Sequence, residues 1–228
     1  MAPLNSEASR RGGTVSTVEA EVAKVERVWL DDTSWVDVVR GWLPDADAVY
    51  AEVLERSQWQ QGRLWRYEKW VTEPRMSAWG HTAYAHPALA DAERTLEKQY
   101  GVRFGGYALA YYRNGADGQA FHRDRDMKWC ENTVIAIVTL GAKRPWLLRP
   151  RSNRYAHHLD NHGATHDLAP ASGDLLVMGG SCQLNWEHSV AKLRTPVGGR
   201  ISAQWRWTSR TGRQEITAGY RAPLRFSR

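Results

Sequence analysis

The second half of the chain constrains the fold most, because from residue 104 onward it consists of short apolar or alternating segments separated by Gly, Pro, Asn and Asp. Strands are predicted at 104–112, 119–123, 133–140, 144–149, 173–179, 183–190 and 200–208. A succession of short strands with few helices is typical of a sandwich or a barrel. The sequence therefore predicts a mainly β core over residues 104–210.

The first half is more helical, and both ends of the chain are predicted to be tails. Apolar spacing and capping residues predict helices at 35–42, 45–55 and 88–100, and alternation predicts one strand at 64–71. We expect a disordered tail at 1–16, a helical region at 17–103 and a loosely held basic tail at 211–228. A length of 228 residues suits one catalytic domain with extensions.

Composition excludes several classes of protein. The longest apolar stretches, 134–138 and 175–178, are far shorter than the roughly 20 residues of a membrane-spanning helix. The N-terminal residues lack the apolar segment of a secretory signal, and two cysteines cannot form a disulfide framework. We therefore expect a cytoplasmic protein without a membrane partner. The 31 Lys and Arg outnumber the 25 Asp and Glu, which points to an anionic partner.

Histidines are concentrated between residues 157 and 166, but their spacing matches no helical or zinc-finger metal site. We interpret His157, His158, His162 and His166 as members of a solvated surface loop.

A different set of residues indicates a metal site. His122 and Asp124 are two residues apart at the end of a predicted strand, so their side chains point to the same face. His188 follows a strongly apolar strand at 173–180. Two histidines and one carboxylate on one face of a metal are the ligand set of non-haem Fe(II) oxygenases. The sequence predicts that His122, Asp124 and His188 bind iron.

Two arginines on one strand suggest an anionic cosubstrate. Arg200 and Arg206 share one face of the strand at 200–208 and are six residues apart, which is about 20 Å at a rise of 3.3 Å per residue. Two guanidiniums in a core repel each other unless an anion lies near them, and arginine binds carboxylates through bidentate hydrogen bonds. A dicarboxylate satisfies this requirement, although a surface strand of a basic protein would show the same pattern.

Taken together, these motifs resemble the AlkB-type 2-oxoglutarate/Fe(II) dioxygenases from about Glu73 to Trp207. The matching segments are 74–79, 112–115, 122–124, 139–141, 173–178, 186–190 and 200–206. The resemblance implies a double-stranded β-helix (jelly-roll) core with flanking helices, an α+β protein that is mainly β. It also implies that residues 17–103 include a nucleotide-recognition lid.

The resemblance implies a role for each motif residue. Fe(II) would bind His122, Asp124 and His188, and O₂ would be the co-oxidant. Arg200 would bind the distal carboxylate of 2-oxoglutarate, Arg206 would lie near its metal-chelating end, and Tyr112 would donate its hydroxyl to it. In the lid, Trp79 and Tyr84 would cover a flipped base, and Asp126 would contact its exocyclic group.

Three positions depart from the family pattern. Ala110 and Ser202 replace asparagines that are usual two residues before the motif Tyr112 and two residues after Arg200. Both changes are expected to weaken hydrogen bonding to the cosubstrate while the arginines remain. Trp79 and Gly80 lack the tyrosine that commonly separates them, which alters the expected shape of the lid.

The function implied by the resemblance is oxidative demethylation of N-alkylated bases in DNA and RNA by a monomer, releasing succinate, CO₂ and formaldehyde. Residues 191–228 carry nine Lys and Arg against one Glu, which is consistent with phosphate contacts. One alternative is the same iron chemistry on a small molecule or a protein. A second is a non-catalytic nucleic-acid-binding module with the same fold.

Overall fold

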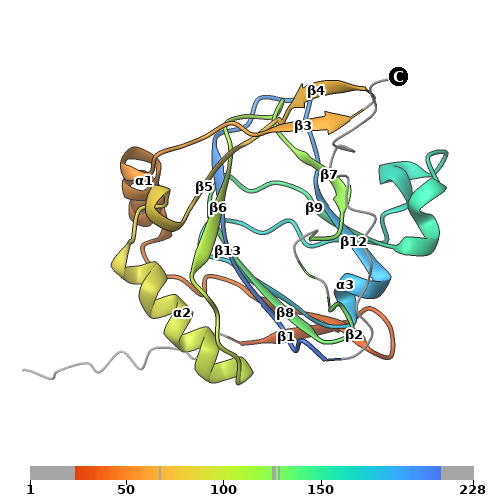
Figure 1. Ribbon diagram of the computed structural model, residues 1–228, viewed down its shortest axis with the longest axis horizontal. Coiled ribbons are helices and arrows are strands. Elements are labelled where there is room, and N and C mark those ends of the chain that lie inside the picture. The colour runs from red at the N-terminus through yellow and green to blue at the C-terminus, as the bar shows by residue number, and fades with distance from the viewer. Residues whose placement is uncertain (1–23, 67, 125–126, 128, 212–228) are drawn as a thin grey trace, which may run out of the picture.

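The structure is a computed structural model that describes residues 24–66, 68–124, 127 and 129–211. Two antiparallel sheets face each other across the core (Figure 1). The major sheet has the strand order β1-β2-β11-β8-β13-β6-β5, and the minor sheet has the order β10-β9-β12-β7. The tail predicted at 1–16 lies outside the described residues, as does the tail predicted at 211–228 after Thr211.

The strands of the major sheet are β1 (Glu26–Trp29), β2 (Ser34–Val39), β5 (Met76–Trp79), β6 (Tyr107–Tyr112), β8 (Thr133–Gly141), β11 (Leu175–Gly180) and β13 (Arg200–Thr208). The strands of the minor sheet are β7 (Gln119–His122), β9 (Trp146–Pro150), β10 (His166–Asp167) and β12 (Trp186–Val190). A separate hairpin consists of β3 (Arg63–Arg66) and β4 (Lys69–Thr72). The helices are α1 (Ala46–Arg56), α2 (Pro87–Tyr100) and α3 (Cys182–Asn185), with 3₁₀ turns η1 (Gly80–Thr82), η2 (Arg151–Tyr155) and η3 (Asp160–Gly163).

From β6 to β13 the chain passes repeatedly between the two sheets. Strands β6, β8, β11 and β13 belong to the major sheet, and β7, β9, β10 and β12 belong to the minor one. This arrangement is the double-stranded β-helix, so the predicted mainly β, jelly-roll fold is confirmed.

The central strand β8 separates two hydrophobic cores. Its residues Ile135 and Ile137 face the core between the sheets, whereas Val134, Ala136 and Val138 face the core beneath α1 and α2. Because β8 is buried on both faces, its sequence is continuously apolar rather than alternating. Strand β13, which carries Arg200 and Arg206, pairs with β8 along its whole length. No helix in the described part of the chain is long and apolar enough to cross a membrane.

The helix predicted at 35–42 is wrong, since residues 34–39 form strand β2. This strand lies between β1 and β11 and is buried on both faces, so it lacks the alternation that identifies a half-exposed strand. Trp35 stacks against Tyr100 of α2, while Val36 and Val38 face the core between the sheets. The three β-branched valines favour a strand over a helix.

Two further segments differ from the predicted elements. The single strand expected at 64–71 is a hairpin, because the chain reverses at Glu68, whose φ is 60°. No Gly, Pro or Asn marks this turn in the sequence. The strand expected at 183–190 begins only at Trp186, because the four preceding residues form helix α3.

The histidine-rich segment has the surface position that was predicted. His157, His158 and His162 are exposed, and His166 belongs to the short strand β10.

Candidate metal centre and cosubstrate site

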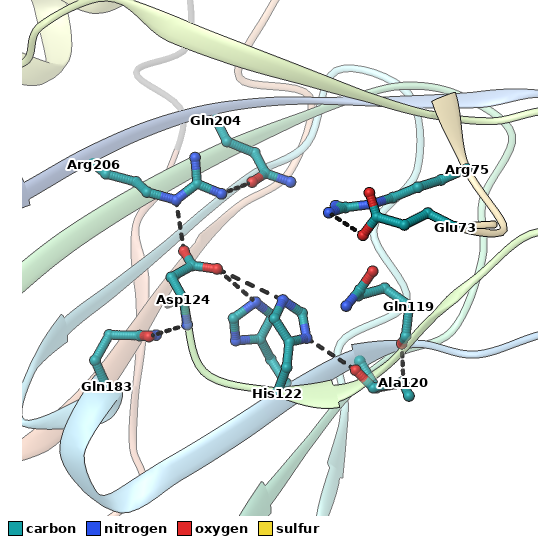
Figure 2. A network of polar contacts seen from close by, with 11 residues as sticks. Glu73, Arg75, Gln119, Ala120, His122, Asp124, Gln183, Gln204 and Arg206 are labelled. Carbon is teal, nitrogen blue, oxygen red and sulfur yellow. Dashed lines mark hydrogen bonds and ion pairs between the residues drawn. The ribbon is translucent and has the colours of Figure 1, made fainter. Parts of the chain in front are cut away.

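Strands β7 and β12 bring three metal-ligating side chains together. His122 ends β7 and lies opposite His188 of β12, and Asp124 follows two residues later. Oδ1 of Asp124 lies 3.6 Å from Nε2 of His122 and 3.9 Å from Nε2 of His188 (Figure 2). The potential ligand atoms all lie within 4.8 Å of one another, and no other such group occurs among the described residues.

Neighbouring groups orient both imidazoles. Nδ1 of His122 lies 2.9 Å from the backbone carbonyl oxygen of Ala120. Because a carbonyl only accepts hydrogen bonds, Nδ1 carries the proton and Nε2 presents its lone pair to the cluster. The ring of His188 stacks on the indole of Trp146, with a centroid separation of 5.4 Å and an interplanar angle of 17°. Both rings are thus held in place by the protein itself.

Hydrogen bonds and charge keep Asp124 ionised. Nε of Arg206 donates a hydrogen bond to Oδ2 of Asp124 over 2.7 Å (Figure 2). The backbone N–H of Asp124 donates to Oε1 of Gln183 over 2.8 Å and fixes the backbone at this position. Burial opposes ionisation of Asp124, but the positive charge of Arg206 outweighs it and holds the pKa of Asp124 well below its usual value. Burial and the nearby His122 lower the pKa of His188 to about 3. A carboxylate and a neutral imidazole are the ligand forms that bind Fe(II), so the donor set fits this metal.

A fully buried guanidinium lies on the inner face of β13. Nη2 of Arg200 donates to Oγ1 of Thr139 over 3.2 Å, but Nε and Nη1 have no hydrogen-bond partner among the described residues. Tyr112 of β6 lies directly opposite Arg200 in the sheet. Burial lowers the pKa of Arg200 to about 10, so it remains charged at neutral pH. A buried cation with unpaired donors requires an anion, and the distal carboxylate of 2-oxoglutarate fits this requirement.

The two arginines of β13 differ in their electrostatic partners. Arg206 pairs with a carboxylate of the protein, Asp124, and also donates to Oε1 of Gln204. Arg200 has no carboxylate partner among the described ion pairs. An anion, Asp124, therefore already lies beside Arg206, whereas Arg200 has room for an anion from outside the protein.

The three residues predicted to contact a base have different surroundings. Trp79, at the end of the edge strand β5, is 54% exposed. Tyr84 is half-buried, with the guanidinium of Arg56 3.9 Å from its ring centroid and its carbonyl accepting from the hydroxyl of Tyr107. None of these contacts is with the His–Asp–His cluster, and the role of Tyr84 toward a base stays a prediction. Asp126 lies outside the described residues.

Sequence reasoning gave no individual role to Arg75, which faces the metal cluster. Figure 2 shows Arg75, Glu73 and Gln119 around the same space as His122. Nε of Arg75 is buried without a partner among the described residues, and Nη2 reaches Oε1 of Glu73 at 3.4 Å. Its positive charge contributes to the lowered pKa of His188. Arg75 lies in the segment 74–79 that resembles the family, but a lone arginine between strands carries no spacing signal of its own, so only the fold shows which space its side chain faces.

A cavity of about 800 Å³ lies beside the centre and is separate from it. It is bounded by the ends of β4 and β7, by β9 and by the loop that includes His157 and His162. Phe121 and Leu147 line it, whereas none of the three metal-ligand candidates does.

The chain matches the family model of the 2OG-Fe(II) oxygenase superfamily over residues 42–218. It is 26% identical over 167 residues to alpha-ketoglutarate-dependent dioxygenase alkB homolog 3 from Bos taurus. The alignment covers 66% of this chain and 57% of that protein. It is 25% identical over 179 residues to DNA oxidative demethylase ALKBH2 from Homo sapiens, which covers 71% and 68%, respectively. The chain thus spans little more than half the length of the alkB homolog 3 relative.

Solved structures support the fold. A prolyl hydroxylase from Trichoplax adhaerens, in complex with a peptide fragment of the hypoxia inducible factor oxygen degradation domain, superposes with a TM-score of 0.51. The two chains are 15% identical, and the superposition covers 75% of this chain and 83% of the other. Enzymes of this superfamily use Fe(II), 2-oxoglutarate and O₂, and a donor set suited to Fe(II) is present here. The chain belongs to the 2OG-Fe(II) oxygenase superfamily and is an AlkB-type member of it.

Proposed function

We propose that this protein removes alkyl groups from N-alkylated bases of DNA and RNA by oxidation. In the overall reaction an N-methyl base, 2-oxoglutarate and O₂ give the repaired base, formaldehyde, succinate and CO₂. This proposal rests on the cluster of His122, Asp124 and His188, which is a donor set suited to Fe(II). The buried Arg200 lies on the facing sheet. The AlkB-type relatives support the choice of substrate.

The proposed metal ligands are His122, Asp124 and His188. Bound Fe(II), together with 2-oxoglutarate and O₂, supplies the oxidising power that hydroxylates the N-alkyl carbon. The protein holds Asp124 ionised through Arg206 and orients His188 on Trp146. These contacts preorganise three ligands on one side and leave the opposite side for cosubstrate.

We assign 2-oxoglutarate binding to Arg200, Tyr112 and Arg206. The unpaired Nε and Nη1 of Arg200 are suited to the distal carboxylate, and the opposite Tyr112 can donate its hydroxyl to the same ligand. Arg206 lies next to Asp124, the proposed carboxylate ligand of the metal, and therefore near the end of the cosubstrate that would chelate the metal. Thr139 holds Arg200 from the side through its hydroxyl.

Trp79 is the residue we assign to the substrate base. Reaching a base in a duplex requires flipping it out, which is easiest for a base that already pairs poorly, as an N-alkylated one does. An exposed indole can then recover about 1–3 kcal/mol by stacking on a base. Arg75, which lies beside the metal cluster in Figure 2, adds positive charge for a polyanion. Action as a monomer in the cytoplasm stays a prediction.

A panel of substrates tests this function. The protein is incubated with Fe(II), ascorbate and 2-oxoglutarate and offered oligonucleotides that contain 1-methyladenine or 3-methylcytosine, as single or double strands. In parallel it is offered N-methylated peptides. Loss of 14 mass units from an oligonucleotide, matched by formaldehyde release, is the expected result. Consumption of 2-oxoglutarate with loss of methyl only from peptides, or from none of these substrates, would contradict the nucleic-acid assignment.

A further inference from the structure

A second fully buried arginine lies beside the proposed cosubstrate site. Arg144, in the loop between β8 and β9, is 1% exposed, and Arg200 is 0% exposed. The guanidinium carbon of Arg144 lies 5.6 Å from the ring centroid of Tyr112, and Tyr112 is the cross-strand neighbour of Arg200. Tyr112 therefore adjoins both arginines. The charge of Arg144 also acts on Arg200, because it contributes to the lowered pKa of that residue after burial.

The hydrogen bonds of Arg144 do not include a carboxylate. Nη1 donates to the backbone carbonyl of Asn114 over 3.0 Å, and Nη2 donates to the carbonyls of Asp117 and Ala191, each over 2.7 Å. These are neutral acceptors, and Nε has no partner among the described residues. Burial accordingly lowers the pKa of Arg144. Placing two cations in one core is unfavourable unless an anion joins them.

The carboxylate of Asp117, whose charge acts on Arg144, forms its ion pair with Arg113. Asp117 accepts from Nε of Arg113 over 2.7 Å and from Nη2 of Arg113 over 2.8 Å. Arg113 is 41% exposed, so this pair lies at the surface end of the same turn. Among the described ion pairs none includes Arg144 or Arg200. The positive potential at Tyr112 is thus available to a ligand.

We propose that Arg144 is a positioning residue that makes the cosubstrate site selective for 2-oxo acids with a second, distal carboxylate. The proposal rests on the assignment of that carboxylate to Arg200. Arg144 acts in two ways: it fixes the turn at Asn114 and Asp117 and the segment at Ala191 around Tyr112, and it adds a second positive charge to the pocket. A ligand without the distal carboxylate gains nothing from this charge.

Two substitutions separate the charge from the hydrogen bonds. Arg144→Gln keeps an N–H donor and loses the charge, whereas Arg144→Lys keeps the charge and loses the planar fork. Arg113→Gln is the matched control, because it removes an arginine from the same turn at its exposed end. Calorimetry on Mn(II)-loaded protein then gives the Kd of 2-oxoglutarate and of 2-oxopentanoate, which lacks the distal carboxylate, without turnover. Circular dichroism and melting temperature verify folding.

Arg144→Gln should raise the Kd of 2-oxoglutarate about tenfold or more, since a buried charge acts over several ångströms. The Kd of 2-oxopentanoate should change by less than about twofold. Arg144→Lys should retain most of the selectivity, and Arg113→Gln all of it. Two results would show that Arg144 acts only through its hydrogen bonds and not through its charge. One is an equal loss of affinity for both ligands, and the other is selectivity that is lost in the Lys variant and kept in the Gln variant. If Arg144→Gln does not fold, the Lys variant still distinguishes an effect of the charge from an effect of the hydrogen bonds.

Arg200→Met is the separate control. If it leaves the Kd of 2-oxoglutarate unchanged, the assignment of the cosubstrate site itself fails.

Discussion

Nε of Arg206 donates a hydrogen bond to Oδ2 of Asp124 over 2.7 Å, while Oδ1 of the same carboxylate faces the imidazoles of His122 and His188. The arginine therefore occupies one carboxylate oxygen and leaves the other for a metal. The same contact neutralises the buried charge of Asp124 when no metal is bound, and so stabilises the folded protein. It also holds Asp124 in the orientation in which the carboxylate can bind a metal.

Substitution of Arg206 by Gln should weaken metal binding by about 10–100-fold, because Asp124 loses the group that orients it. The measurement is a competition titration with Fe(II) or Mn(II) and a chromophoric chelator. Arg154→Gln is a suitable control, because Arg154 pairs with Glu187 on the outer side of the minor sheet. An unchanged metal affinity in the Arg206 variant would show that Asp124 keeps its orientation without the arginine.

Arg200→Met should have opposite effects on cosubstrate binding and on the stability of the apo protein. Loss of the charge-assisted hydrogen bonds should raise the Kd of 2-oxoglutarate by about 30-fold or more. Removal of a buried cation with two unpaired nitrogens should raise the free energy of unfolding by about 1–4 kcal/mol. Calorimetry and urea unfolding measure the two effects. A variant that is both destabilised and fully competent for 2-oxoglutarate would exclude Arg200 from the site.

The sequence predicted the elements whose environment leaves a periodic or local signature. The strands that carry His122 and His188 and the order of the motifs were visible, because a two-residue spacing defines a common face. Helix α2 was also visible, since Pro87 begins it and Gly101, with φ 65°, ends it. These features depend on residues that are close in the chain.

Features set by distant residues could not be predicted. Strand β2 was mistaken for a helix, because burial on both faces removes the alternation at Val36 and Val38. The contact of Arg206 with Asp124 joins residues 82 positions apart, and the stacking of Trp146 on His188 joins two different strands. The buried position of Arg144 likewise depends on three carbonyls from separate segments.

Asp31 should make stability depend on pH in the acidic range. Burial opposes its ionisation, but hydrogen bonds from Trp186, Thr33 and Ser34 prevail and lower its pKa to about 2. A carboxyl with a depressed pKa stabilises the folded state above its unfolded pKa of 3.8, and this contribution is lost as the pH falls toward 2. Urea unfolding should show Asp31→Asn to be about 1–2 kcal/mol less stable than the parent at pH 6, with the difference shrinking at pH 2. A difference that does not depend on pH would refute this origin.

Trp79→Ala should weaken the binding of a methylated oligonucleotide by about 5–100-fold, in keeping with the stacking of one base on an indole. Turnover of 2-oxoglutarate without substrate should stay unchanged, since Trp79 lies on the edge strand β5. Trp29→Ala is the matched control: Trp29 is 60% exposed and lies on β1, at the opposite edge of the same sheet. Fluorescence anisotropy measures the binding. Equal effects of the two substitutions would argue against a specific role for Trp79.

The most direct measurement is the stoichiometry of one reaction on a single-stranded oligonucleotide that contains one 3-methylcytosine. With Fe(II), O₂ and 2-oxoglutarate, the protein should release succinate, formaldehyde and repaired cytosine in equal amounts, and Asp124→Ala should release none of them. Succinate formed without formaldehyde and without loss of the methyl group would contradict the proposed function, and full repair by Asp124→Ala would contradict the proposed metal centre.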